Sequence, residues 1–131
     1  MMDEFTDIKL TGLDTDLTRQ SPSASGMKLV YLSLSELPPQ EWRQIFDQER
    51  ASPRHSMWRR AHVEGQHIVI DCPLDEVERI HLKDLKTDVA NSNAKYRDLV
   101  FRQAERFRGV EDSRKREQSE IDDLANRLDF D

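Results

Sequence analysis

The side chains able to do chemistry are few, and most of them lie between residues 52 and 72. The segment 52–60 is SPRHSMWRR, with three arginines, one histidine and one tryptophan but no acidic residue. Arginine and tryptophan together are enriched at protein interfaces and at stacked or phosphate-bearing ligands. The segment therefore predicts a basic binding loop whose candidate residues are Arg54, Trp58, Arg59 and Arg60. The alternative is a structural loop: Trp58 anchors it on the core, and its arginines pair with Glu41, Asp47 or Glu49.

Two histidines and the single cysteine follow this loop. His62 and His67 are expected on the exposed face of a hairpin, and we include both in the candidate binding surface. Zinc needs three or four converging ligands, so two histidines do not predict a metal site. Cys72 is expected to point inward as a buried structural thiol, because a nucleophilic cysteine needs a neighbouring base or helix N-terminus to lower its pKa. No phosphate-loop, dinucleotide, zinc or nucleophile-elbow motif occurs. We expect no enzyme and no cofactor.

Three changes in the period of the apolar residues predict the elements that position these side chains. The run 27–34, MKLVYLSL, predicts a strand. Pro38 and Pro39 favour the start of a helix, which has Trp42, Ile45 and Phe46 on its buried side and ends before Pro53. Phe5, Ile8, Leu10 and Leu13 give a weaker signal of an N-terminal edge strand. The polar segment 18–26, TRQSPSASG, is typical of a linker.

The hairpin is predicted in register, because Gly65 suits the first central position of a type II′ turn. Glu64 then pairs with His67, and Ala61 pairs with Ile70. One face carries Ala61, Val63, Ile68, Ile70 and Cys72; the other carries Arg60, His62, Glu64, His67, Val69 and Asp71. The expected core consists of Leu29, Tyr31, Trp42, Ile45, Phe46, Ala61, Val63, Ile68, Ile70, Leu85 and Val89.

A long helix is predicted from Asp75 to Arg108, with Gly109 as its stop or break. At about 1.5 Å per residue such a helix spans roughly 50 Å, which is longer than a small sheet can cover. Its distal half carries the apolar residues Leu99, Val100, Phe101 and Phe107. The charged segment 111–120 is either a solvated helix or disordered, and a short amphipathic stretch with Ile121, Leu124 and Leu128 follows.

These elements predict an α+β fold: a two-layer antiparallel sheet in the order strand-helix-hairpin-helix, with a long C-terminal helix. The order resembles part of a ferredoxin-like arrangement, an analogy of topology alone. In this arrangement the outer sheet face is open and bears Arg60, His62 and His67. The expected organisation is an N-terminal extension at 1–26, the domain at 27–110 and a charged C-terminal arm at 111–131.

Composition restricts the partners and the compartment. The net charge is −6, which makes the chain a poor general binder of nucleic acid or anionic membrane. One cysteine allows no internal disulfide, and no apolar run reaches the length of a membrane span. The N-terminus lacks the basic and apolar regions of a signal peptide. We therefore expect a cytoplasmic protein with no membrane partner.

Two functional hypotheses follow. The first is a non-enzymatic protein–protein interaction protein that binds another protein or itself, as a homodimer, through the long helix and C-terminal arm. Its candidate residues are Leu99, Phe101, Phe107, Leu124 and Leu128. The alternative is a nucleic-acid-binding module that uses the basic loop and the open sheet face. The arm could instead fold back on its own domain.

Overall fold

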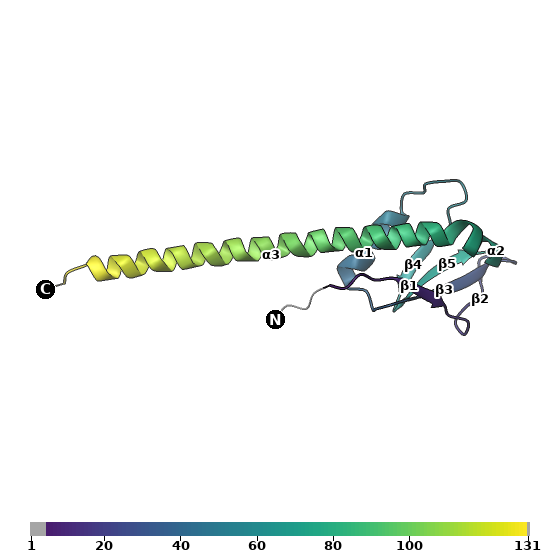
Figure 1. Cartoon of the computed structure of the whole chain (residues 1–131), viewed down its shortest axis with the longest axis horizontal. Coiled ribbons are helices and arrows are strands. Elements are labelled where there is room, and N and C mark those ends of the chain that lie inside the picture. Colours follow the sequence, from purple (N-terminus) through teal and green to yellow (C-terminus); the bar gives the residue numbers. More distant parts are fainter. Residues whose placement is uncertain (1–4, 131) are drawn as a thin grey trace. The chain divides into compact units, whose positions relative to one another are not determined.

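The computed structural model describes residues 5–130, and the chain divides into two compact units, the first ending at Arg97 and the second beginning at Asp98. The elements in chain order are β1 Leu10–Leu13, β2 Arg19–Gln20, β3 Lys28–Leu34, α1 Gln40–Arg50, β4 Ala61–Glu64, β5 His67–Cys72, α2 Leu74–Glu76, the π-helical turn η1 Val77–His81 and α3 Leu82–Arg127 (Figure 1). This confirms the predicted α+β fold with an antiparallel sheet and a long C-terminal helix. In the described residues, no helix is long and apolar enough to cross a membrane.

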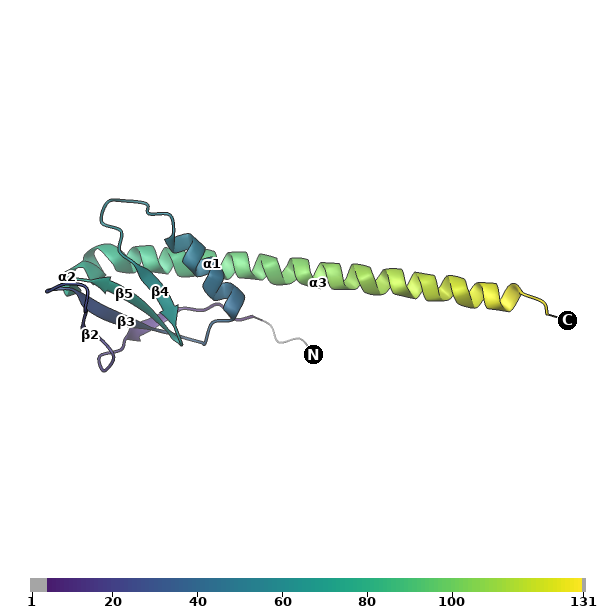
Figure 2. The ribbon, with the colours of Figure 1, turned by 180° about the vertical axis from the view of Figure 1, so that it is seen from behind.

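The five strands form one antiparallel sheet in the order β1-β3-β5-β4, and β2 also pairs with β3. Helix α1 connects β3 to β4, so β5 is inserted between the two strands of a strand-helix-strand unit (Figure 2). That insertion is the ferredoxin-like part of the topology. The place on the other side of β3 is taken by β1, which confirms the predicted N-terminal edge strand.

The segment predicted as a linker is partly in the sheet. Arg19 pairs with Leu29 and Gln20 with Lys28, so β2 extends the edge that β1 begins. The loop closes with Gly26 at φ 83°, a backbone conformation that glycine adopts without steric cost. Arg19 and Gln20 therefore belong to the sheet, and the linker prediction was wrong there. The division into 1–26, 27–110 and 111–131 stays a prediction.

The hairpin has the predicted register. Ala61 pairs with Ile70, His62 with Val69, Val63 with Ile68 and Glu64 with His67. Gly65 has φ 57° and no other residue of the described turn has positive φ, which fits a type II′ turn and excludes type I′. Alternation along the two strands therefore places one set of apolar side chains toward the helices, as predicted.

The core lies between the helices and this face of the sheet. Its buried members come from the N-terminal segment, the sheet, α1 and the start of α3: Ile8, Val30, Leu32, Leu34, Trp42, Phe46, Val63, Ile68, Ile70, Cys72, Leu85 and Val89. Ile45 is only half-buried, and Ala61 packs at the edge of the cluster. Leu29 and Tyr31 were predicted in this core, but on β3 the core residues are Val30, Leu32 and Leu34.

Tyr31 is buried on the opposite face of the sheet, beside its cross-strand neighbour Val69. The guanidinium of Arg19 lies 5.2 Å from the ring centroid of Tyr31, and the ring of His67 meets Tyr31 edge-on at 5.8 Å. The centre of this face is therefore covered, and the prediction of an open sheet face was wrong there, whereas Arg60 and His62 at the edge of the face are exposed as predicted. Alternation alone did not distinguish the two faces of β3, because both carry apolar side chains.

Helix α1 starts after Pro39, whose extended backbone caps the helix, and ends at Arg50. The ring of Trp42 stacks parallel to that of Phe46 at a centroid distance of 5.7 Å. The indole N–H of Trp42 donates a hydrogen bond of 2.9 Å to Oδ1 of Asn93 on α3. The predicted helix and its buried side are confirmed, and α1 and the start of α3 are joined through this pair.

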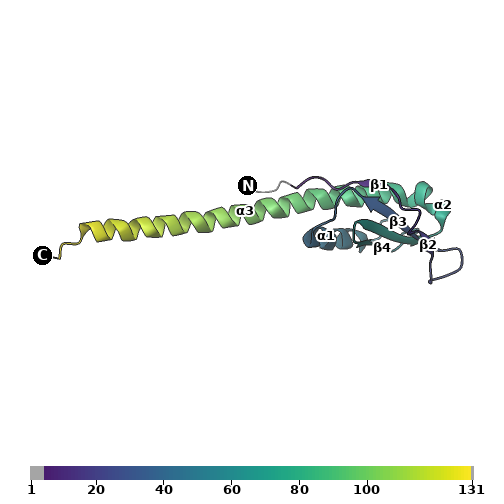
Figure 3. The same ribbon diagram turned by 90° about the horizontal axis from the view of Figure 1, so that it is seen from below.

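The C-terminal helix continues well past the predicted stop. Gly109 lies inside α3, and the charged segment 111–120 is helical to its end (Figure 3). A glycine in a helix costs only about 1 kcal/mol relative to alanine, which neighbouring helix formers offset. Ion pairs such as Arg114–Glu111, at 3.2 Å and spaced i,i+3, also support the helix. Because α3 is continuous to Arg127, the arm does not fold back on residues 98–110.

Candidate functional site

The basic loop is built around Trp58. Its indole ring lies against two guanidinium groups, Arg50 at 3.8 Å and Arg54 at 4.6 Å from the ring centroid. The indole N–H donates a 2.9 Å hydrogen bond to the carbonyl oxygen of Arg50. Trp58 thus anchors the loop, as the structural alternative predicts, but to the C-terminal end of α1 and not to the core. Its ring is already engaged by arginines of the chain itself.

The arginines around this ring pair with carboxylates of α3. Arg50 donates to Asp88 at 3.0 Å, and Arg54 contacts the other oxygen of the same carboxylate at 2.8 Å. Asp88 is completely buried, so two arginines neutralise one inaccessible charge. His55 lies 2.6 Å from Asp84, one helical turn earlier. Burial lowers the pKa of Arg50, and Asp88 opposes that shift.

A second charged cluster joins the loop to the π-helical turn. Arg59 donates two 3.0 Å hydrogen bonds, from Nε and Nη2, to the two carboxylate oxygens of Glu76. Nε2 of the fully buried His81 lies 2.9 Å from the same carboxylate. The hydrogen bonds from Arg59 lower the pKa of Glu76 to about 2; burial opposes this shift and His81 adds to it. Arg50 also donates to the backbone carbonyl of Arg59.

These partners differ from those expected. The loop was predicted to pair with Glu41, Asp47 or Glu49, whereas the structure pairs it with Asp84, Asp88 and Glu76. The pairing is internal, and Arg60 is the exposed arginine of the loop to which the described residues offer no ion pair. Arg60 and His62 line a shallow pocket of about 480 Å³ with Trp58 and Arg59. Most of the positive charge that a phosphate would need is therefore already balanced.

The two histidines of the hairpin have different surroundings. Nε2 of His67 is 3.0 Å from Asp14, while His62 is exposed and 3.5 Å from Glu64. The described residues contain no group of three or more side chains able to hold a metal ion. Asp14 has a pKa below its usual value, because it accepts backbone N–H groups of its own turn and a hydrogen bond from His67.

Cys72 is fully buried, on the side that the register predicted. Burial raises the pKa of its thiol to about 11, and the nearby carboxylate of Glu76 adds to the shift. The thiol is thus protonated at neutral pH, which is the opposite of what an activated nucleophile needs.

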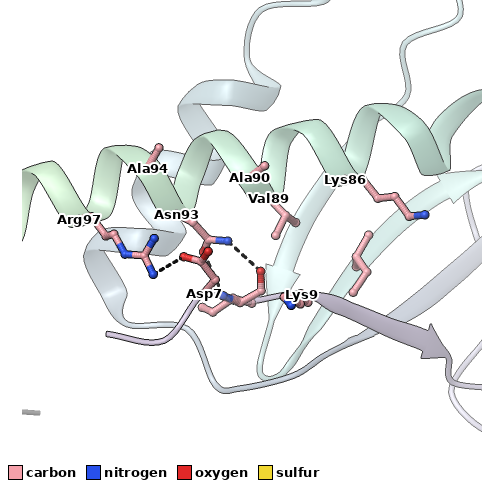
Figure 4. Close-up of a pocket in the computed structure, with 10 residues that line it drawn as sticks. Asp7, Lys9, Lys86, Val89, Ala90, Asn93, Ala94 and Arg97 are labelled. Carbon is pink, nitrogen blue, oxygen red and sulfur yellow. Dashed lines mark hydrogen bonds and ion pairs between the residues drawn. The ribbon is translucent and has the colours of Figure 1, made fainter. Parts of the chain in front are cut away.

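A groove that the sequence did not predict lies between the N-terminal segment and α3 (Figure 4). Its volume is about 450 Å³, and Lys9, Lys86 and Arg97 stand among its lining residues. Asn93 clamps the backbone of Ile8, accepting from its N–H at 3.1 Å and donating to its carbonyl at 2.8 Å. Arg97 is paired with Asp7 at 2.8 Å. The one sequence signal for this contact was an asparagine on the buried side of a predicted helix.

The second unit presents a different kind of surface. We define the distal seam as the side chains of α3 and its C-terminal end that recur every three or four residues along one side: Leu99, Gln103, Phe107, Val110, Arg114, Glu117, Ile121, Leu124 and Leu128. At 100° per residue they lie within an arc of about 100°. Phe107 is 67% exposed and Ile121 is 59% exposed. The seam thus contains large apolar side chains in contact with solvent.

The sequence-predicted residues of this helix divide between two sides. Leu99, Phe107, Leu124 and Leu128 belong to the distal seam. Phe101, which is 61% exposed, lies about 120° around the helix from Phe107 and is outside it. Of the two predicted surfaces, the helix therefore retains exposed apolar side chains, whereas the basic loop is largely committed to internal pairs. No protein-family model matches the chain, and comparison with curated proteins and with solved structures finds no match.

Proposed function

We propose that this protein is a non-enzymatic interaction protein that binds another protein chain through the distal seam. The observation that carries the proposal is the row of exposed apolar side chains at helical spacing, which includes Phe107, Val110, Ile121, Leu124 and Leu128. A helix of this kind gains stability when its apolar stripe is covered by a second helix. Residues 98–127 span about 45 Å at about 1.5 Å per residue, enough for four heptads.

Several features support binding rather than catalysis. The Cys72 thiol has a raised pKa and no exposure, and two of the three arginines of the basic loop, Arg54 and Arg59, are held in pairs with Asp84, Asp88 and Glu76. These pairs also weaken the nucleic-acid alternative, since each carboxylate would have to be displaced by a phosphate. We place the protein in the cytoplasm, where a single buried thiol stays reduced.

The test compares two phenylalanines of the same helix. Phe107→Glu places a charge in the distal seam, and Phe101→Glu places the same charge on the other side. Both side chains are exposed, so neither variant disturbs a core. Sedimentation velocity of the purified protein, and of a labelled protein added to cell extract, measures the mass of the complexes formed.

We expect Phe107→Glu to lose the complex and Phe101→Glu to keep it. If both variants form complexes of the same mass, in the pure protein and in extract alike, the proposal is contradicted, because the distal seam then contributes nothing to binding. Urea unfolding of the first unit, followed by the fluorescence of Trp42 and Trp58, controls for loss of the fold. A complex lost in both variants through unfolding of this unit would be visible as a lower urea midpoint.

A further inference from the structure

The two charged residues of the distal seam, Arg114 and Glu117, stand at its centre. From Gln103 to Leu128 the intervals between seam residues alternate between four and three, the repeat of a coiled coil. Arg114 and Glu117 occupy two adjacent core positions of this repeat. Phe107 and Val110 precede them and Ile121 and Leu124 follow, so the apolar positions are distributed symmetrically around one basic and one acidic residue.

We infer that the partner of the distal seam is a second copy of this chain, packed antiparallel about a two-fold axis midway between Arg114 and Glu117. The inference rests on the proposed function and names its partner. In this arrangement every core layer joins an a position of one copy to a d position of the other, as antiparallel pairs require. The layers, each occurring twice by symmetry, are Arg114 with Glu117, Val110 with Ile121, Phe107 with Leu124 and Gln103 with Leu128 of the other copy.

Charge selects this arrangement over the parallel one. A parallel pair in register would place Arg114 on Arg114 and Glu117 on Glu117, and like charges facing each other in a core layer are strongly unfavourable. The antiparallel pair converts the same four residues into two ion pairs. Polar residues at core positions lower the stability of a coiled coil but fix its register, because every shifted register would bury a charge against an apolar side chain.

The outer positions carry a second orientation signal. On one edge of the antiparallel pair Ala104 approaches Ala125, and these small side chains allow close packing. On the other edge Arg106 approaches Arg127, which is a local repulsion. In a parallel pair Arg106 would instead approach Glu111 of the other copy. The effect of a charge reversal at Arg106 therefore differs in sign between the two orientations.

The first test is cysteine cross-linking of the full chain. Val110 and Ile121 are 58% and 59% exposed, so Val110→Cys and Ile121→Cys leave the fold unchanged. Cys72 is buried with a raised pKa and stays out of the reaction. In the antiparallel pair, position 110 of one copy and position 110 of the other are separated along the axis by about eleven residues, or about 16 Å at about 1.5 Å per residue. Position 110 of one copy lies in the same core layer as position 121 of the other.

We expect mild oxidation, or a short bismaleimide, to cross-link an equimolar mixture of the two variants and to leave each single variant uncross-linked. Cross-linking of each single variant with itself would show a parallel pair and overturn the inference. A dimer that cross-links neither in the mixture nor in the single variants has another register, and this result also overturns the inference. A strictly monomeric pure protein would overturn self-pairing, while the comparison of Phe107→Glu with Phe101→Glu in extract still decides the proposed function.

The second test exchanges the central charges. Arg114→Glu places an acid opposite Glu117 of the other copy, and Glu117→Arg places a base opposite Arg114. Each variant alone should raise the dimer dissociation constant about tenfold or more. An equimolar mixture should restore it, because one chain then carries two acids and the other two bases. Failure of the mixture to recover would show that these two residues do not face each other.

The third test is Arg106→Glu, a single substitution that reports orientation without cross-linking. In the antiparallel pair it replaces the approach of two arginines by an attraction between the new carboxylate and Arg127, and it should lower the dissociation constant. In a parallel pair it would bring the new carboxylate close to Glu111 of the other copy and raise that constant. Sedimentation equilibrium at low salt measures the change, and a rise would overturn the antiparallel inference.

Discussion

Two parts of one helix differ in what surrounds them. Between Leu82 and Arg97 the helix α3 contributes five buried residues: Leu85, Asp88, Val89, Ser92 and Asn93. From Asp98 to Phe130 no described residue is buried, although this part contains phenylalanine, isoleucine and leucine at helical spacing. The first part is stabilised by the sheet and by α1. The second is stabilised by pairs within its own helix.

This difference shows which apolar residues the fold uses for itself. In the first unit the apolar side chains of the core pack against one another, and the buried Asp88 carboxylate is paired with Arg50 and Arg54 of the same unit. Pairs such as Arg102–Asp98, at 2.7 Å and spaced i,i+4, contribute only about 0.2–0.5 kcal/mol each in an exposed helix. The distal seam therefore has apolar surface that a second chain would cover.

The largest expected effect is the loss of stability caused by a substitution in the core of the first unit. Trp42→Ala should lower the free energy of unfolding by about 3–5 kcal/mol, because it removes a fully buried indole and its hydrogen bond to Asn93. Phe101→Ala, in the exposed part of α3, should change it by less than about 0.5 kcal/mol. Urea titrations of both variants make the comparison. Similar losses at the two sites would remove the distinction between the regions.

Removing a carboxylate should also lower the free energy of unfolding much more in the first part of α3 than in the second. Asp88→Ala leaves the guanidinium of Arg50 buried without its partner and should cost about 3 kcal/mol. Asp98→Ala is the matched control on the same helix, since its pair with Arg102 is exposed and contributes less than about 0.5 kcal/mol. A small effect of Asp88→Ala on the urea midpoint would show that the two arginines are not held by this residue.

Acid should destabilise the first unit through Glu76. The pKa of Glu76 is lowered in the folded chain, from an ordinary value of 4.5 to about 2, by its hydrogen bonds from Arg59. The folded state therefore binds the proton less readily than the unfolded state. The contribution of Glu76 to stability is present above pH 4.5 and is lost as the pH falls toward 2.

Glu76→Gln removes this contribution. The thermal unfolding temperature, followed from neutral pH down to the folded-state pKa of Glu76, should fall less steeply in Glu76→Gln than in the wild type. Arg60→Ala is the control, because Arg60 is an exposed neighbour of Arg59 that does not hold the carboxylate. Parallel curves for Glu76→Gln and the wild type would contradict the assigned role of the Arg59–Glu76 pair.

The smallest expected effect is the labelling of Cys72 by thiol reagents. Its thiol is buried with a pKa of about 11, so thiol reagents at neutral pH should label it only as the first unit opens. The variant Ser113→Cys, on the exposed part of α3, should react as fast as a free thiol. Rapid labelling of Cys72 in the native protein would show that it is accessible and would reopen the nucleophile hypothesis.

Local patterns predicted the elements well. The hairpin register followed from period-two alternation around Gly65, and α1 followed from Pro39 and the spacing of Trp42 and Phe46. Both signals act within a few residues of the chain. The predicted end of α3 at Gly109 is wrong, because the helix formers and ion pairs on either side of this glycine outweigh its cost in a helix.

Long-range pairing was beyond the reach of these patterns. The structural alternative predicts Trp58 as a loop anchor, but nothing near residue 54 indicates that Asp84 and Asp88 pair with the loop. Both faces of β3 carry apolar side chains, so Tyr31 was assigned to the wrong side of the sheet. The distal seam was recognisable in part, since Phe107, Leu124 and Leu128 were candidates, whereas Phe101 lies outside it.

Amide hydrogen exchange at two protein concentrations tests most directly whether the two regions differ in what stabilises them. Isolated helices are marginal in water, whereas a helix in a complex is protected in proportion to the bound fraction. We predict that residues 98–127 exchange rapidly in dilute protein and become protected as the concentration rises, while β3, β5 and residues 82–97 keep the same protection. Protection of residues 98–127 that is strong and independent of concentration, and unchanged by Phe107→Glu, would contradict this account.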